Sequence, residues 1–377
     1  MRIIKHISIF AFLCISLFGT SQGLFQCINE NGEVIFELAA DFVHPFSDGV
    51  AVYKRNGLYG YVGLDGKIIS DAKYEKASDY SEGVSWVKEP FSAGFVLINK
   101  NQERLSSKTY EKHGIYKEGM CAVYENEKLG FVRINGEETI PCKYIGAPYF
   151  SENKACVSLY DSKTEKYGFI NPKGEMIIPF SYIQSGYSNF ENGEARVKIN
   201  GKTCLINEKG NVVFTPMLSQ NLEGFSSGLS ATYTKPNRTG WGFINRKNQW
   251  AIQPTYDHAT SFKHGYSIVT KDKKKGVIDT LGNLIIPMIY DELYANPHSD
   301  GYFVCENSGK RVYLNAKGEK FTDLNIEYLL SSNGHSILPY KSTTGKMGFL
   351  NMDGTERIKA QYERANSFSE GKAWVKP

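Results

Sequence analysis

Short segments of alternating hydrophobic and polar residues run along the chain, separated by turn-forming residues. In residues 194–198, Ala195 and Val197 alternate with charged neighbours, which predicts a strand with one buried and one hydrated face. Residues 168–171 and 175–178 are short, mainly apolar runs joined through Asn-Pro-Lys-Gly, a sequence that favours a tight turn. Such a unit predicts about three antiparallel strands and no helix.

The unit recurs every 34–38 residues. Its first marker is an aliphatic residue followed by Asn or Asp, two variable residues and Gly, with Tyr twelve residues after the aliphatic position. The aliphatic positions are Ile28, Val62, Ile98, Val132, Ile170, Ile206, Ile244, Ile278, Leu314 and Leu350. Gln102 and Asn248 replace the Gly in two units. The tyrosines are Tyr74, Tyr110, Tyr144, Tyr182, Tyr256, Tyr290 and Tyr362. A period of this length indicates a repeat architecture.

A second marker is an aromatic residue, two polar residues and Gly, followed by a short alternating strand. It occurs at residues 46–49, 80–83, 116–119, 190–193, 225–228, 262–265 and 368–371. One unit has too little apolar area to fold alone, so neighbouring units must stack into a continuous core. We therefore predict an all-β tandem array of about ten short three-stranded antiparallel units.

Two arrangements of this array remain possible. The chain after the leader begins with the first type of strand and ends with the last type. In a closed, propeller-like ring, the terminal strand would complete the sheet of the first unit. Ten three-stranded units, however, exceed the usual number of propeller blades and lack their four strands. We expect an open, superhelical array, with the closed ring as the alternative.

The first 21 residues have the pattern of a secretory leader. Arg2 and Lys5 precede the apolar segment 7–18, and Gly19-Thr20-Ser21 offers small residues for cleavage. The apolar segment is too short to cross a bilayer. We expect a protein exported to the periplasm or the extracellular space, without an anchor, and a single β-repeat domain over residues 22–377.

The charge balance gives little reason to expect a polyanionic partner. The chain has 44 basic and 40 acidic residues, and removal of Arg2 and Lys5 leaves a net charge near +2. The lysines of residues 271–275 are interrupted by Asp272, and we interpret them as a solvated turn. We therefore expect neither nucleic acid nor an anionic membrane as a partner.

One repeat carries a recognisable motif. Residues 241–245 are Trp-Gly-Phe-Ile-Asn, and Ile252, Pro254 and Tyr256 follow. Equivalent pentapeptides occur at 167–171, 275–279 and 347–351. The pattern resembles the WG (or KWG) repeat family of bacterial proteins over essentially all of residues 24–377.

The resemblance has two departures. The namesake Trp occurs only at position 241, and the repeats near 98–116 and 312–338 are degenerate. The family resemblance implies a β-repeat architecture and a role in interactions. It brings no catalytic residue to this chain.

The chain offers several fragments of catalytic or metal-binding motifs. Residues 224–228 match G-x-S-x-G, but the same Phe-Ser-x-Gly recurs in other repeats, which favours a structural turn. Only His258 and His264 lie close in sequence among the histidines, and no zinc motif is present. Cys121 and Cys156 occupy similar positions in consecutive repeats; either one disulfide or two buried thiols would fit. We predict no catalytic, cofactor or metal site and assign no binding residues.

The repeated tyrosines have two interpretations. They form either a packing ladder between units or an exposed row that stacks on sugar rings. We expect a monomeric, non-enzymatic exported protein whose extended surface binds a protein, with glycan binding through exposed aromatic rows as the alternative. An enzyme assembled from several loops is a third possibility. Specificity is expected in positions that differ between repeats, including loops Thr234–Thr239 and Tyr160–Lys166.

Overall fold

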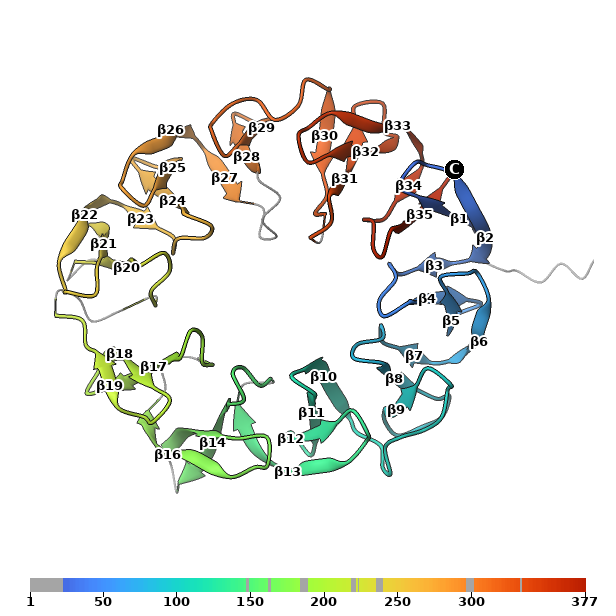
Figure 1. The fold of residues 1–377 in the computed structure, drawn as a ribbon, viewed down its shortest axis with the longest axis horizontal. Coiled ribbons are helices and arrows are strands. Elements are labelled where there is room, and N and C mark those ends of the chain that lie inside the picture. Colours follow the sequence, from blue (N-terminus) through green and yellow to red (C-terminus); the bar gives the residue numbers. More distant parts are fainter. Residues whose placement is uncertain are drawn as a thin grey trace, which may run out of the picture.

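The computed structural model describes residues 23–146, 149–161, 164–183, 189–217, 222, 224–234, 240–295, 302–332 and 334–377. The predicted leader at 1–21 lies outside these residues. The described residues form 35 strands and no helix, which confirms the all-β prediction. Among them, no helix has the length and hydropathy needed to cross a membrane. The strands are arranged as the blades of a ring (Figure 1).

Blade 2 shows the plan of the repeat. Its strands β3 (Phe42–Val43), β4 (Val50–Arg55), β5 (Leu58–Gly63) and β6 (Ile68–Tyr74) form an antiparallel meander in chain order. The turn between the first and second strands, called the inner turn below, faces the centre of the ring, and the fourth strand lies at the periphery (Figure 1). The turn between the third and fourth strands is called the outer turn.

The other blades repeat this plan with local variation. The strands of blades 3 to 5 are β7 (Lys76–Ala77), β8 (Val84–Lys88), β9 (Val96–Asn99), β10 (Lys112–Lys117), β11 (Met120–Glu125), β12 (Lys128–Arg133), β13 (Glu138–Gly146), β14 (Ala155–Asp161), β15 (Thr164–Ile170) and β16 (Met176–Ile183). Those of blades 6 and 7 are β17 (Glu194–Ile199), β18 (Lys202–Asn207), β19 (Val212–Phe214), β20 (Ser230–Tyr233), β21 (Trp241–Ile244) and β22 (Trp250–Tyr256). Strand β13 continues into blade 5, so blades 4 and 5 share one seven-stranded sheet.

Blades 8 to 10 lead back to the start of the chain. Their strands are β23 (His258–Ala259), β24 (Tyr266–Lys271), β25 (Lys274–Asp279), β26 (Leu284–Tyr290), β27 (Glu292–Ala295), β28 (Tyr302–Asn307), β29 (Lys310–Asn315), β30 (Ile326–Leu329), β31 (Ile337–Ser342), β32 (Met347–Asn351) and β33 (Glu356–Tyr362). The degenerate repeats still form blades: bridges Ile98↔Arg104 and Leu314↔Lys320 replace the fourth strand in blades 3 and 9.

Blade 1 is built from both ends of the chain and closes the ring. Its sheet order is β2 (Val34–Ala40), β1 (Gly23–Asn29), β35 (Lys372–Lys376) and β34 (Arg364–Ala365). Strands β1 and β35 pair antiparallel, with Cys27 opposite Trp374. Of the two expected arrangements, the structure has the closed ring rather than the open array. Closure pairs two strands whose hydrogen-bonding edges would otherwise be unpaired.

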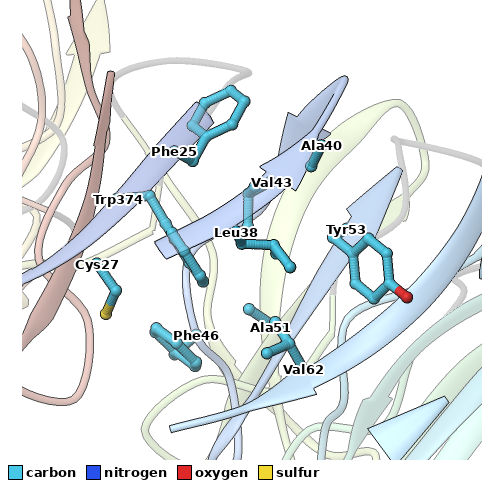
Figure 2. Close-up of a cluster of buried hydrophobic side chains, with 10 residues drawn as sticks. All are labelled: Phe25, Cys27, Leu38, Ala40, Val43, Phe46, Ala51, Tyr53, Val62 and Trp374. Atoms are coloured by element: carbon cyan, nitrogen blue, oxygen red, sulfur yellow. The ribbon is translucent and has the colours of Figure 1, made fainter. Parts of the chain in front are cut away.

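Side-chain packing supports this closure. Trp374 is 1% exposed and stacks on Phe46 of blade 2 at a centroid distance of 5.5 Å, with Phe36 of β2 edge-on at 5.4 Å. Figure 2 shows the Trp374 side chain between Cys27 and Leu38 within this cluster. The last strand thus contributes the largest side chain of a core that the N-terminal strands and blade 2 complete.

The expectation of three strands per unit was incomplete. Four of the blades begin with a two-residue strand, such as β7 or β23, which precedes the inner turn. Two residues are too few to show alternation, so the sequence pattern merged them with the preceding extended segment. With this strand, blades 1, 2 and 8 reach the four strands of an ordinary propeller blade, whereas blade 3 has three strands and the bridge at Ile98.

Aromatic pairs fill the seams between blades. The aromatic residue of the third strand contacts the inner-turn aromatic of the next blade. The pairs and centroid distances are Tyr61–Tyr80 at 4.9 Å, Phe131–Phe150 at 4.8 Å, Phe169–Phe190 at 4.9 Å, Phe243–Phe262 at 4.6 Å and Phe349–Phe368 at 4.9 Å. All ten rings are less than 2% exposed. Burial of these rings supplies the apolar area that a single unit lacks.

The repeated tyrosines also lie at the seams, as the packing-ladder interpretation predicts. Tyr74 and Tyr110 are 3% and 2% exposed. The Tyr74 hydroxyl donates to Gln102 Oε1 at 3.1 Å, and the Tyr182 hydroxyl donates to the Gly210 carbonyl at 3.2 Å. Each of these acceptors belongs to the outer turn of the next blade. The tyrosines therefore do not form an exposed row.

Glycine in the Trp-Gly pair has a structural cause that the sequence did not reveal. At Gly242 the fourth strand of the blade bulges, and the pairing register shifts between Trp241 and Phe243. A Cβ added at Gly242 would lie 2.6 Å from the Ile252 carbonyl oxygen. Real Cβ atoms do not approach backbone this closely, so the bulge requires glycine.

Candidate binding site

The inner turns are tight hairpin turns around the centre of the ring. In blade 2, Ser47 bridges Val50 across the two central residues Asp48 and Gly49, whose φ angles are 53° and 80°. Positive φ at both positions is typical of a type I′ turn and explains the Gly. The preceding Phe46 is buried in the seam. The first central residue is left exposed or half-exposed, and its identity varies between blades.

Carboxylates at this position join consecutive inner turns. The Glu370 carboxylate of blade 1 accepts from the Gly49 N–H at 2.9 and 3.1 Å. The equivalent bonds run from Gly83 N to Asp48 (2.7 Å), Gly119 N to Glu82 (3.0 Å), Glu152 N and Asn153 N to Glu118 (both 2.8 Å), and Gly193 N to Glu152 (3.0 and 3.2 Å). A continuous chain of charge-assisted hydrogen bonds therefore links the inner turns of blades 1 to 6.

The chain of carboxylates stops at blade 6. Asn192, Ser227 and His264 occupy the equivalent position in blades 6, 7 and 8. Within the described residues, the N–H groups of Gly228 and Gly265 have no hydrogen-bond partner. Among the described residues, the inner turns of blades 7 and 8 thus present backbone N–H groups without an acceptor. In blades 2 to 6 a carboxylate of the preceding blade accepts from the equivalent inner turn.

A pocket of about 450 Å³ opens where the carboxylate chain ends. It lies along the inner turns of blades 4 to 7. Its lining residues are Lys117, Tyr149, Ser151, Asn189, Phe190, Glu191, Asn192, Glu194, Arg196, Leu205, Gly224, Phe225 and Arg246. The volume is within the range of small-ligand sites, but the lining is polar and charged.

Charged side chains cover the aromatic walls of the pocket. Arg246, in the outer turn of blade 7, makes a bidentate ion pair with Glu194, with both N–O distances 2.7 Å. Its guanidinium lies 4.4 Å from the centroid of Phe225. The Glu194 carboxylate raises the pKa of Arg246, against a smaller opposing effect of burial. At the other end, Lys117 lies 4.5 Å from the centroid of Tyr149.

The lining of the pocket is mainly polar and charged. Its lining contains cations, carboxylates, amides and the hydroxyl groups of Tyr149 and Ser151, and neither histidine nor cysteine. Of its two carboxylates, Glu194 is held by Arg246. Within the described ranges, no group of three or more His, Cys, Asp or Glu side chains could hold a metal ion.

The structure separates the fragments of catalytic motifs. Ser226 of the G-x-S-x-G string lies in the inner turn of blade 7, and strand β20 follows where a nucleophile elbow would need a helix. His258 packs beside Trp241 at 4.9 Å, whereas His264 lies in the inner turn of blade 8. The serine is therefore part of a repeated structural turn, as the sequence indicated.

The six cysteines of the described residues form no disulfide. Cys121 and Cys156 are buried in different hydrophobic clusters and form no disulfide. Burial raises the pKa of the Cys121 thiol to about 12, and that of Cys27 and Cys305 likewise. Thiols with such pKa values are poor nucleophiles at neutral pH.

The variable loops named from the sequence are only partly described. Residues 235–239 of loop Thr234–Thr239 and residues 162–163 of loop Tyr160–Lys166 lie outside the described residues. Sequence reasoning missed the pocket residues Lys117, Arg196 and Arg246. The available signal was their variation at positions beside the repeated turn residues, but nothing in the sequence showed that these positions converge.

Comparison with known families decides the identity of the repeat. Seven segments match the family described as "WG containing repeat": residues 27–59, 59–89, 130–162, 167–202, 241–274, 276–310 and 347–376. Together they cover more than half of the chain. The chain belongs to this WG repeat family. Stretches 90–129, 203–240 and 311–346 lie outside the matches, yet they supply strands such as β9, β19 and β30 to the ring.

Similarity to solved structures is distant. A structure titled "Crystal structure of the eukaryotic initiation factor" is 12% identical, covers 94% of this WG repeat chain and 99% of its own, and has a TM-score of 0.47. BamB from Moraxella catarrhalis is 10% identical, covers 80% of this chain and 96% of its own, and has a TM-score of 0.35. No curated protein matches the sequence.

Proposed function

We propose that this WG repeat protein is a non-enzymatic binding module that holds a segment of a partner protein in the pocket of blades 4 to 7. The observation that carries the proposal is that repeated and variable residues lie in different parts of the structure. Repeated aromatics and tyrosines are largely buried in the seams, whereas most of the pocket lining, apart from the inner-turn aromatics Phe190 and Phe225, consists of residues that differ between repeats. Variable residues on a rigid repeated scaffold are the usual means by which repeat proteins acquire specificity.

The lining favours a peptide over a sugar ring. Sugar recognition by stacking needs an open aromatic face. The faces of Tyr149 and Phe225 are taken by Lys117 and Arg246, and Phe190 is 1% exposed with Lys154 over its ring at 4.9 Å. Charged and amide groups that remain exposed suit the polar backbone and side chains of a peptide.

The remaining parts of the proposal come from the sequence. The leader pattern at residues 1–21 supports export, and we propose that the mature chain acts as a monomer in the periplasm or outside the cell. A lining of charged, amide and hydroxyl groups supports a binding role. The near-neutral charge of the mature chain supports a protein partner over nucleic acid.

The decisive experiment incorporates a photo-crosslinking amino acid into the protein in its native host. The test position is 191, which is exposed in the pocket, and the control position is 200. Asn200 lies in the same blade, in the turn at the other end of strand β17. We expect a defined protein adduct from position 191 and none from position 200. The adduct is identified by mass spectrometry, and a glycan array is probed in parallel.

Charge variants make the test specific to the pocket. The double variant Lys117→Glu/Arg196→Glu should abolish the adduct, whereas Lys128→Glu/Lys202→Glu should leave it unchanged. The control residues lie in the same two blades, in the turns at the opposite ends of the strands. Equal adducts from positions 191 and 200, or glycan binding without any protein adduct, would show that the proposal is wrong.

A further inference from the structure

We infer that Phe91 is an anchor that inserts into an apolar pocket of a partner protein. The residue lies in the loop of residues 89–94, which joins β8 to β9 in blade 3. This loop lies at the other end of β8 from the inner turn of the same blade. The inferred contact is therefore a second interaction site, separate from the pocket of blades 4 to 7, and it does not rest on the proposed function.

The first support is the exposure of the Phe91 side chain. Its relative exposure is 105%, the highest among the exposed large apolar residues of the described chain. Pro90 and Ala93 in the same loop are exposed as well, so the loop forms a small apolar projection. A ring in this position contributes nothing to the core of its own blade, and the apolar area that it offers can be buried only by another molecule.

The second support is the backbone conformation of the same residue. The Ser92 N–H donates to the Glu89 carbonyl at 3.1 Å, which closes a turn with Pro90 and Phe91 at its centre. The φ angle of Phe91 is 65°. Pro followed by a positive φ is typical of a type II turn, which favours Gly or Asn at the second position. Among the non-glycine residues with positive φ in the described chain, Phe91 is the only apolar one. The strain brings no packing in return, so it points to a role outside the fold.

The third support is the ordered base of the loop. The Ser92 hydroxyl donates to the Gly94 carbonyl at 2.8 Å and accepts from the Gly94 N–H at 3.3 Å. Gly94 itself lies against the backbone of Tyr110, since a Cβ added there would be 2.4 Å from the Tyr110 carbonyl oxygen. These contacts hold the turn in one conformation, which lowers the entropy lost when a partner encloses the ring.

The surrounding turns favour a protein pocket over a bilayer. The equivalent turns of blades 2, 4, 6 and 8 carry the polar residues Asn56, Asn126, Asn200 and Asp272. A flat bilayer that buried Phe91 would also meet the polar turns of the neighbouring blades, whereas a pocket can enclose one aromatic side chain. Glu89 is exposed and forms no ion pair within the described residues. We therefore expect a cationic group at the rim of the partner's pocket.

The test incorporates a photo-crosslinking amino acid at position 93 of the full chain in its native host. The control position is 126, which is exposed in the equivalent turn of blade 4. Both are combined with Phe91→Ala or with Leu281→Ala, which removes an 81% exposed apolar side chain from the outer turn of blade 8. We expect a defined protein adduct from position 93 and none from position 126. Phe91→Ala should abolish the adduct, and Leu281→Ala should leave it unchanged.

Three further measurements use purified proteins. Against the protein identified from the adduct, Phe91→Ala should weaken binding at least roughly tenfold, and Glu89→Gln by a smaller factor. Phe91→Gly should weaken binding as much as Phe91→Ala and also raise the urea midpoint above that of wild type, because Gly accepts a positive φ without strain. Vesicles of phosphatidylethanolamine and phosphatidylglycerol should not carry the wild-type protein with them in flotation.

The inference is overturned by the absence of an adduct at position 93, by equal adducts at positions 93 and 126, or by an adduct that persists in Phe91→Ala. A urea midpoint of Phe91→Gly at or below that of wild type would remove the argument from strain and overturn it as well. Flotation of wild type that is lost in Phe91→Ala would show that Phe91 enters a bilayer and that the protein partner is wrong. An adduct at position 93 without one at position 191 would contradict the proposed function and leave this inference standing.

Discussion

Arg246 and Glu194 form a bidentate ion pair across the seam between blades 6 and 7, and the preceding seam carries the same contact with its charges reversed. There, Lys154 occupies the position of Glu194 and pairs with Glu208, the equivalent of Arg246, at 2.8 Å. In both cases the cation also covers the inner-turn aromatic of the later blade. Lys154 lies over Phe190 of blade 6, and Arg246 lies over Phe225 of blade 7. The backbone of the repeat therefore accepts either polarity at this seam.

Exchange of the charges should consequently be tolerated, whereas a single reversal should not. We expect Glu194→Lys, which places like charges together, to lower the free energy of unfolding by about 1 kcal/mol. The double variant Glu194→Lys/Arg246→Glu should recover most of this loss. The Glu194 and Arg246 side chains are 20% and 49% exposed, so the effect is that of a partly screened pair. Urea unfolding in a double-mutant cycle measures the coupling; strictly additive losses would contradict the seam contact.

Closure of the ring should depend on Trp374. Its replacement by Ala removes the largest side chain of the cluster shared by both chain ends, and we expect a loss of about 3–5 kcal/mol in unfolding free energy. The control Phe91→Ala concerns a fully exposed aromatic and should change stability by less than about 0.5 kcal/mol. Similar urea midpoints for the two variants would be inconsistent with a core that spans β1 and β35.

The bulge behind the Trp-Gly pair gives a prediction about backbone space. Gly242→Ala would place a methyl group against the Ile252 carbonyl and should cost about 1–3 kcal/mol. Gly193→Asn is the contrasting case, because Asn153 already occupies the equivalent position with φ of 57° and open space surrounds Gly193. We expect its cost to stay below about 1 kcal/mol. Thermal denaturation of both variants compares the two reasons for glycine. Gly242→Ala tests the close approach of backbone, and Gly193→Asn tests the positive φ.

Stability should fall in mild acid because of His113. Its ring stacks on Trp86 at 5.3 Å, accepts from or donates to Ser78 Oγ at 3.2 Å, and donates from Nδ1 to the Gly114 carbonyl at 2.8 Å. Burial lowers the pKa of His113, partly opposed by the Gly114 carbonyl. The unfolded chain, with a histidine pKa near 6.5, therefore takes up the proton first as the pH falls.

The His113 contribution should thus be complete above about pH 6.5 and decline below it. Urea midpoints measured from pH 8 to pH 5 should decrease less in His113→Gln than in wild type. His264→Gln, at an exposed inner turn, should retain the wild-type slope. An unchanged slope in His113→Gln would assign the acid sensitivity to other groups.

Local features of the blades were predictable because their causes are local. Alternation at Ala195 and Val197 places β17, and the Asn-x-x-Gly strings place the outer turns. Gln102 and Asn248, the two exceptions to glycine, have φ of 67° and 59°, so the turn persists where the motif fails. The two-residue strands escaped prediction because they leave no periodic signal.

The pocket escaped prediction for a different reason. Lys117, Arg196 and Arg246 are far apart in the sequence, and they come from three different blades. Convergence of these side chains depends on how consecutive blades are rotated around the centre. The repeated tyrosines, by contrast, were evident in the sequence, but their location was not. Both a seam and an exposed row fitted the sequence, and their burial in the structure decided between the two.

The sequence by itself determined the repeat, its turns, its all-β character and the need for neighbouring units to share a core. These properties follow from side-chain periodicity and from the φ preferences of Gly and Asn. Only the tertiary structure decided that the array closes, that β35 completes the sheet of β1, and that a polar pocket opens where the carboxylate chain ends. Closure is the sum of ten small rotations between blades, and no residue pattern within one repeat specifies that sum.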